Sequence, residues 1–178
     1  MDDLNPYAAP QSDVLRQDED AMRIRQEHLR TEAHLKALGI FYVATTVLAV
    51  ISTHLTNQAK GADFGVHFPI SNKQFIIWTA NMIAGAGLYW FKPFAKWLTA
   101  LLLINAGYNS LMQLPLGIGG LIVLGIVLRF LLHSKTRRVL SQDYASILKQ
   151  TTALRSRPAG WIWLVLAAIA LLMLRFIL

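Results

Sequence analysis

Four apolar blocks constrain this chain more than any other feature of its sequence. They cover residues 37–55, 75–91, 97–132 and 158–178, and nearly all charged residues lie between them. Of the 178 residues, 54% are hydrophobic and 15% are charged, whereas about 25% are charged in a typical soluble domain. A transmembrane helix needs roughly 20 consecutive apolar residues. The sequence therefore predicts an all-α fold, an integral membrane helical bundle.

We expect about five transmembrane helices, over residues 37–55, 75–91, 97–114, 116–132 and 158–178. The third and fourth divide the block 97–132, which as one helix would be roughly 54 Å long, almost twice a hydrocarbon core of about 30 Å. Pro115 and Gly117 favour a turn there, because proline removes a helical donor and glycine adopts turn conformations. Two alternatives stay open: one kinked helix, which gives four spans, and a re-entrant hairpin.

The distribution of cations favours five spans. Residues 1–36 hold five Lys/Arg and eight Asp/Glu, a net charge of −3, and the other 142 residues hold twelve Lys/Arg and two Asp/Glu, a net charge of +10. With the N-terminus inside, five spans leave 14 Lys/Arg on the inner side and three outside, namely Lys60, Lys73 and Arg175. Since cytoplasmic loops are enriched in Lys and Arg, we predict a cytoplasmic N-terminus and a periplasmic C-terminus.

Residues 1–36 form a cytoplasmic tail ahead of the transmembrane domain 37–178. Residues 1–20 carry two prolines and an acidic cluster at 18–20, which predicts disorder because little apolar surface is available for burial. Residues 21–36 predict a helix with a thin apolar stripe of Met22, Leu29 and Ala33 and the i,i+4 pairs Glu19–Arg23 and Glu32–Lys36. An acidic, polar start is not typical of a signal peptide.

Residues 135–157 predict a cytoplasmic amphipathic connector helix with Ser141 as its N-cap. One helical face carries Leu140, Tyr144, Ile147, Leu148, Thr151 and Leu154. The candidate contacts to lipid headgroups are Lys135, Arg137, Arg138, Lys149, Arg155 and Arg157. The connector either lies on the inner leaflet with its apolar face down or packs on the ends of the spans.

Polar side chains inside the predicted spans are candidate functional residues, because burying them in lipid is costly. They are Asn81, Asn105, Asn109 and Gln113. These amides either form interhelical hydrogen bonds or line a track for a small solute. In the second span, Ala80, Ala84, Gly85 and Gly87 predict a close helix contact within the bundle.

The sequence shows no catalytic or cofactor-binding motif, so we predict neither an enzyme nor a cofactor. Two sets of residues contain metal-ligating side chains, His54 with Asp63 and His67, and His28 with Glu32 and His34. Neither has the spacing of a compact metal site, so no metal is predicted. The basic excess flanks the spans, where contact with an anionic leaflet explains it better than nucleic acid does.

Three segments resemble one family. They are Asn5-Pro6-Tyr7-Ala8-Ala9-Pro10, the segment Glu32 to Gly39 at the entry into the first span, and Leu114-Pro115-Leu116-Gly117 followed by Ser134 to Arg138 and Ser141 to Tyr144 of the basic connector. This layout resembles a family of bacterial multi-pass inner-membrane proteins with an N-terminal motif of the NPYAAP type. The resemblance implies the topology and a bacterial inner membrane, but no activity and no site residue.

These observations favour an accessory, scaffold or interaction protein of the inner membrane. The expected partners are the anionic inner leaflet and a membrane protein or a second copy of the chain, and no nucleic acid is expected. The alternative is a small-solute transporter or channel subunit lined by the intramembrane Asn and Gln side chains.

Overall fold

The computed structural model describes residues 11–64, 71–112 and 118–168, which are helical or form short connections between helices. The helices are α1 (Gln11–Phe64), α2 (Asn72–Tyr89), α3 (Pro93–Met112), α4 (Ile118–Leu132), α5 (Ser134–Val139) and α6 (Gln142–Gln150). Residues 161–168 form a further helical segment. The prediction of an all-α fold is confirmed for the described residues.

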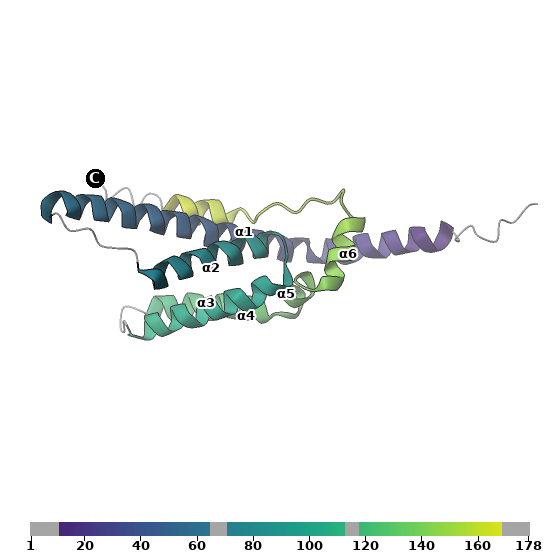
Figure 1. The fold of residues 1–178 in the computed structure, drawn as a ribbon. Coiled ribbons are helices and arrows are strands. Elements are labelled where there is room, and N and C mark those ends of the chain that lie inside the picture. The colour runs from purple at the N-terminus through teal and green to yellow at the C-terminus, as the bar shows by residue number, and fades with distance from the viewer. Residues whose placement is uncertain (1–10, 65–70, 113–117, 169–178) are drawn as a thin grey trace, which may run out of the picture.

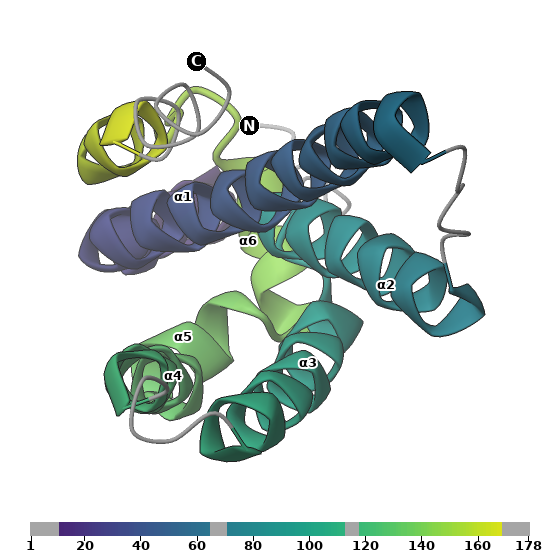
Figure 2. The ribbon, with the colours of Figure 1, turned by 90° about the vertical axis from the view of Figure 1, so that its left-hand side faces the viewer.

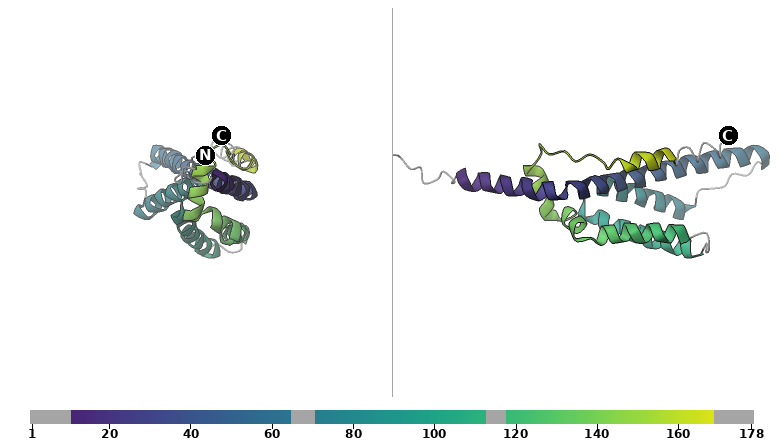
Figure 3. Two further views of the ribbon diagram at one scale, coloured as in Figure 1. Left: turned by 90° about the vertical axis from the view of Figure 1, so that its right-hand side faces the viewer. Right: turned by 180° about the vertical axis from the view of Figure 1, so that it is seen from behind.

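The long helix α1 organises the molecule. Its 54 residues correspond to about 81 Å at 1.5 Å per residue. The chain packs α2 against α1, α3 against α2 and α4 against α3, beside the half of α1 that ends at Phe64 (Figure 1). Residues 161–168 run along another side of α1 (Figure 2). Near the other end α6 crosses α1, and the first turns of α1 project beyond this crossing (Figure 3).

Helix α1 extends further at both ends than the sequence predicted. Residues 11–20 were predicted to be disordered and are helical, whereas residues 1–10 lie outside the described part. Each residue added to an existing helix gains a backbone hydrogen bond, and an acidic first part suits the positive end of the helix dipole. Residues 56–64, which lie beyond the predicted first span 37–55, continue the same helix.

Length and composition identify one membrane-spanning candidate among the described residues, the part of α1 between Asp18 and Thr56. Helix α4 is apolar but has only 15 residues. The polar start of α2, from Asn72 to Gln74, and the two asparagines of α3 lower the mean hydropathy of those helices. These properties alone therefore do not establish a multi-pass bundle.

Two glycines bring α1 and α2 into backbone contact. A Cβ atom built on Gly39 would lie 2.5 Å from the Gly85 carbonyl oxygen, and one built on Gly85 would lie 2.7 Å from the Gly39 carbonyl oxygen. Ala84, Gly85 and Gly87 are buried, so the predicted use of this small-residue face for packing within the bundle is confirmed.

A tight turn connects α2 to α3. The Lys92 amide donates to the Gly87 carbonyl at 2.7 Å and the Phe91 amide to the Leu88 carbonyl at 3.2 Å, which is the hydrogen-bond pattern of a Schellman motif. Phe91 takes the left-handed position of this motif with φ of 54°. Pro93 then begins α3, since proline suits the first helical position. Residues 93–96, predicted as part of a loop, are therefore helical.

Helices α3 and α4 fold back on each other. Their contact includes Gly107, whose added Cβ would lie 3.3 Å from a methyl carbon of Leu124. The alternative of one kinked helix over residues 97–132 is therefore wrong, and a hairpin is present. The predicted turn residues Gln113, Pro115 and Gly117 lie outside the described residues.

The connector forms two short helices instead of one. The Ser141 side chain accepts a hydrogen bond from the Tyr144 amide at 3.3 Å, which confirms Ser141 as an N-cap and starts α6 after a break from α5. Helix α6 ends at Gln150. Residues 151–157 were predicted to belong to the connector helix, but they are not helical. Leu140, Tyr144 and Thr151 are buried, because this face packs on α1 and the core.

The hydrophobic core lies where α1 meets the α2–α3 turn, the end of α4, and α5 and α6. Its buried members include Leu35, Leu88, Phe91, Leu131 and Val139. This core fixes α5 and α6 against α1 and so positions the polar residues described next.

Candidate functional site

A buried polar cluster joins α1 to α6. We define this cluster as Arg25, His28, Glu32, Tyr144 and Thr151, whose exposed fractions range from 0% to 6%. The Arg25 Nε atom lies 3.2 Å from Glu32 Oε1, and the Tyr144 hydroxyl donates to the same oxygen at 2.7 Å. Glu32 thus receives one charged and one neutral donor from two different helices.

Arg25 also binds the C-terminal end of α6. Its Nη1 atom donates to the Thr151 carbonyl oxygen and to Thr151 Oγ1 at 2.9 Å. Thr151 is the C-cap residue of α6, and a cation at this position is favoured by the helix dipole and by the unpaired terminal carbonyls. Arg25 and Glu32 therefore hold α6 at two points that are seven residues apart.

Two further features orient the cluster. Burial, followed by the hydrogen bond to Glu32, raises the pKa of the Tyr144 hydroxyl above its ordinary value of 10.0, so this group remains a neutral donor. His28 Nδ1 lies 2.8 Å from the Ile24 carbonyl oxygen. A carbonyl can only accept, so His28 carries a proton on Nδ1.

A basic surface lies on α5, α6 and the segment that follows them. We define it as the six predicted headgroup contacts Lys135, Arg137, Arg138, Lys149, Arg155 and Arg157, all of which are exposed. The ion pairs formed within the described residues are Asp20–Arg23 and Arg25–Glu32. The six cations are therefore available to bind an external anionic group.

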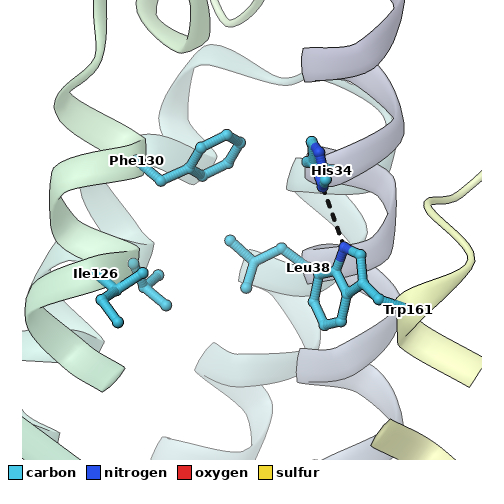
Figure 4. Close-up of a pocket in the computed structure, with 6 residues that line it drawn as sticks. His34, Leu38, Ile126, Phe130 and Trp161 are labelled. Atoms are coloured by element: carbon cyan, nitrogen blue, oxygen red, sulfur yellow. Dashed lines mark hydrogen bonds between the residues drawn. The ribbon is translucent and has the colours of Figure 1, made fainter. Parts of the chain in front are cut away.

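An apolar groove of about 280 Å³ lies between α1, α4 and the segment 161–168 (Figure 4). We define it by its lining residues His34, Leu38, Ile126, Val127, Phe130 and Trp161. Trp161 Nε1 donates to His34 Nδ1 at 3.1 Å. The preceding residues also follow α1, since the Ala159 amide donates to the Ala33 carbonyl at 3.0 Å.

The predicted intramembrane amides that the structure describes lie on two helices, α2 and α3. Asn81 on α2 and Asn105 on α3 are half-buried, and Asn109 is exposed. Asn109 Nδ2 donates to the Asn105 carbonyl of its own helix at 2.9 Å, so this side-chain amide finds a hydrogen-bond acceptor within α3. Gln113 lies outside the described residues.

Of the two candidate sets of metal ligands, the structure separates His34 from His28 and Glu32, whereas His67 of the other set lies outside the described residues. His28 and Glu32 share the buried face of α1, whereas His34 lies in the apolar groove. Within residues 11–64, 71–112 and 118–168, no group of three His, Cys, Asp or Glu side chains is arranged to hold a metal ion.

Sequence reasoning missed the buried polar cluster. The predicted apolar stripe includes Met22, which is 42% exposed, and the predicted partner of Glu32 was Lys36. Instead, Lys36 Nζ donates to the Ser156 carbonyl at 2.8 Å. The available signal was the spacing of Ala21, His28 and Leu35 at seven-residue intervals, which places them on one face of α1.

Comparisons with protein-family models, curated protein sequences and solved structures found no match. The resemblance to bacterial multi-pass membrane proteins stays a prediction.

Proposed function

We propose that this chain is a multi-pass protein of a bacterial inner membrane that holds an interaction platform on the cytoplasmic side. The platform comprises the N-terminal part of α1 up to residue 36, α5, α6 and the basic surface. In this proposal the basic surface contacts anionic headgroups, and the projecting part of α1 is presented to a protein partner.

The observation that carries the proposal is the continuity of α1 combined with its attachment to α6. One helix runs from the platform into the apolar bundle without a break, and the buried polar cluster fixes α6 to it. A partner bound to the platform would therefore engage a preformed surface, which lowers the entropic cost of binding.

Exposed apolar side chains support several membrane crossings. On α3, Trp97 is 71% exposed, Leu101 66% and Ile104 68%, and on α4 Ile122 is 59% and Ile126 64% exposed. Soluble monomers rarely expose contiguous apolar patches of this kind. Lipid chains would cover them in a bundle of five spans, formed by α1 to α4 and the last apolar block.

The charge distribution supports the orientation. Five crossings with the N-terminus inside keep the basic surface and the α2–α3 turn on the cytoplasmic side, where anionic lipids and the positive-inside rule favour cations. The C-terminus then lies in the periplasm.

A transporter or channel is less well supported. Besides the apolar groove, two further grooves lie between α1 and α2, one beside Gly39 and Tyr89 and one beside Val50 and Trp78. All three are lined largely by apolar side chains, and the predicted amides Asn81, Asn105 and Asn109 line none of them. The absence of an enzymatic activity stays a prediction.

Site-specific photocrosslinking in cells tests the proposed function. A photoreactive residue replaces Gln26, which is exposed on the platform, or Gln74, which is exposed at the opposite end of the bundle. We expect a discrete protein adduct at position 26 and none of that size at position 74. The adduct should persist when Asn105 and Asn109 are both replaced by Leu.

The opposite pattern would favour the transporter. In that case purified protein in liposomes would pass small polar solutes, Asn105→Leu with Asn109→Leu would abolish the flux, and position 26 would give no specific adduct.

A further inference from the structure

The apolar groove has a polar end and an apolar floor. His34 and the Trp161 indole nitrogen lie at one end, while Leu38 and Ile126 lie further along α1 and α4 (Figure 4), and Val127 also lines the groove. Its volume of about 280 Å³ lies just below the range of roughly 300–1,000 Å³ for pockets that enclose drug-sized ligands. An open groove of this size and chemistry suits part of one flexible hydrocarbon chain.

The hydrogen bond to Trp161 determines which His34 nitrogen can donate. An indole N–H is only a donor, so His34 Nδ1 accepts and is unprotonated. Burial, and then the neighbouring Arg30, lower the pKa of His34 below its ordinary value of 6.5. The neutral ring therefore carries its proton on Nε2, which makes no hydrogen bond with the described residues and can donate to an anionic oxygen.

Three exposed cations are close in sequence to residues that line the groove, and Arg30 acts electrostatically on His34. Arg30 lies one turn before His34 on α1, Arg129 is next to Phe130 on α4, and Arg157 precedes Trp161 by four residues, and all three are exposed. We call these three residues the cationic rim. Among the carboxylates of α1, Glu27 lies two turns before His34 and Glu32 is buried in the ion pair with Arg25, so the rim keeps a positive excess.

We infer that the apolar groove holds one acyl chain of an anionic phospholipid from the cytoplasmic leaflet, with the lipid phosphate at His34 and the cationic rim. Basic pockets between membrane helices on the cytoplasmic side are suited to anionic headgroups. The inference rests on the proposed membrane location. It goes beyond the basic surface, because it assigns a groove to the acyl chain and adds Arg30, His34 and Arg129, which do not belong to that surface; Arg157 belongs to both the basic surface and the cationic rim.

Lipid binding by native mass spectrometry tests the inference. The full chain, purified in a neutral detergent, is titrated with phosphatidylglycerol or with phosphatidylcholine. We expect one tightly bound phosphatidylglycerol and weaker binding of phosphatidylcholine. Replacement of Arg30 and Arg129 by Gln should weaken phosphatidylglycerol binding about 25-fold, if each cation near the headgroup contributes about fivefold.

A matched control removes the same charge elsewhere. Lys73 and Lys92 are exposed, belong neither to the basic surface nor to the cationic rim, and do not line the groove, so Lys73→Gln with Lys92→Gln should change the affinity less than threefold. Ile126 is 64% exposed, and Ile126→Trp should fill the groove and reduce phosphatidylglycerol binding while leaving the rim intact.

The inference is overturned if the two lipids bind equally well, if both double variants weaken binding to the same extent, or if Ile126→Trp still binds phosphatidylglycerol as tightly as the unmodified chain. Equal binding of both lipids would leave the proposed membrane location intact. Failure to associate with any lipid or detergent would instead contradict the proposed function itself.

Discussion

The two halves of α1 have different environments although they form one continuous helix. Between residues 18 and 38 the buried face includes Ala21, Arg25, His28, Glu32 and Leu35, which contact α6 and the core. Between residues 39 and 56, Gly39 and Thr46 are the buried residues, and several aliphatic side chains face outward: Val47, Val50, Ile51 and Leu55, which are 38–49% exposed.

In the proposed membrane arrangement, this difference is explained by the solvent that each half of α1 would meet. In water, burial of apolar surface drives packing, and specific hydrogen bonds and ion pairs then select one arrangement. In lipid there is no hydrophobic drive between helices, so contacts depend on small residues and close approach while apolar side chains remain on the outside. The comparison predicts that the packing of the first half of α1 depends on hydrogen bonds and ion pairs between polar groups. The packing of the second half should depend on close helix contact at glycine.

The largest effect is expected when the buried ion pair is broken. Glu32→Ala leaves Arg25 buried without its carboxylate and should lower the free energy of unfolding by about 3–5 kcal/mol. Glu32→Gln keeps an acceptor oxygen and should cost less. Urea unfolding in detergent micelles, followed by circular dichroism, measures the change.

The control is Glu27→Ala. Because Glu27 is an exposed carboxylate on the same helix, its loss should change the free energy of unfolding by no more than about 0.5 kcal/mol. Equal effects of both alanine variants would contradict the cluster's role.

A smaller loss is expected when one hydrogen bond of the cluster is removed. Tyr144→Phe deletes the 2.7 Å bond to Glu32 and should cost about 1.5–3 kcal/mol, because the acceptor is charged. Hydrogen exchange of the α6 amides should increase with it. Tyr108 is 59% exposed, so Tyr108→Phe should change neither quantity. Unchanged exchange in Tyr144→Phe would show that the hydroxyl does not fix α6.

The dependence of the second half of α1 on glycine is tested where α1 contacts α2. Gly39→Ala pushes a methyl group against the Gly85 carbonyl and should cost about 1–3 kcal/mol through displacement of α2. A Cβ on Gly125 would meet nothing within 4 Å, so Gly125→Ala should be neutral or stabilise α4 by up to about 1 kcal/mol. Unfolding in the same micelles separates these outcomes. A neutral Gly39→Ala would mean that α1 and α2 are not in backbone contact.

The smallest expected effect is the pH dependence of the contact between His34 and Trp161, near the boundary between the two halves of α1. Because the pKa of His34 is lowered from 6.5, its contribution to stability is complete above pH 6.5 and is lost as the pH falls through the lowered pKa. Protonation of Nδ1 removes the acceptor for Trp161. Trp161 fluorescence, taken as the difference between the unmodified chain and Trp161→Phe, should change in acid. A flat profile down to pH 4 would contradict the contact.

The sequence was informative where one physical effect dominates. Apolar blocks predicted α2, α3 and α4 to within a few residues, because burial from water determines those segments. Ser141 was identified as an N-cap from local chemistry. The small residues of α2 predicted close packing, although their partner Gly39 was not identified.

The buried polar cluster could not be predicted in the same way. Glu32 has a local partner in Lys36 by i,i+4 spacing, and only the tertiary fold brings Arg25 and Tyr144 to the same carboxylate oxygen. A search for apolar periodicity does not detect this buried face of α1, because it contains the polar residues Arg25, His28 and Glu32. The helix at residues 11–20 was missed because local composition does not reveal that a stable helix continues from residue 21.

Reporter-fusion topology tests the central claim most directly, with fusions after Ser71, Lys96, Gln113, Thr152 and Leu178. Five crossings predict that Lys96 and Thr152 report inside and that Ser71, Gln113 and Leu178 report outside. An inside signal at Gln113 with Leu178 outside would instead identify the α3–α4 hairpin as re-entrant. An inside signal at Leu178 would contradict the account, because it requires an even number of crossings and removes the charge asymmetry that places the platform in the cytoplasm.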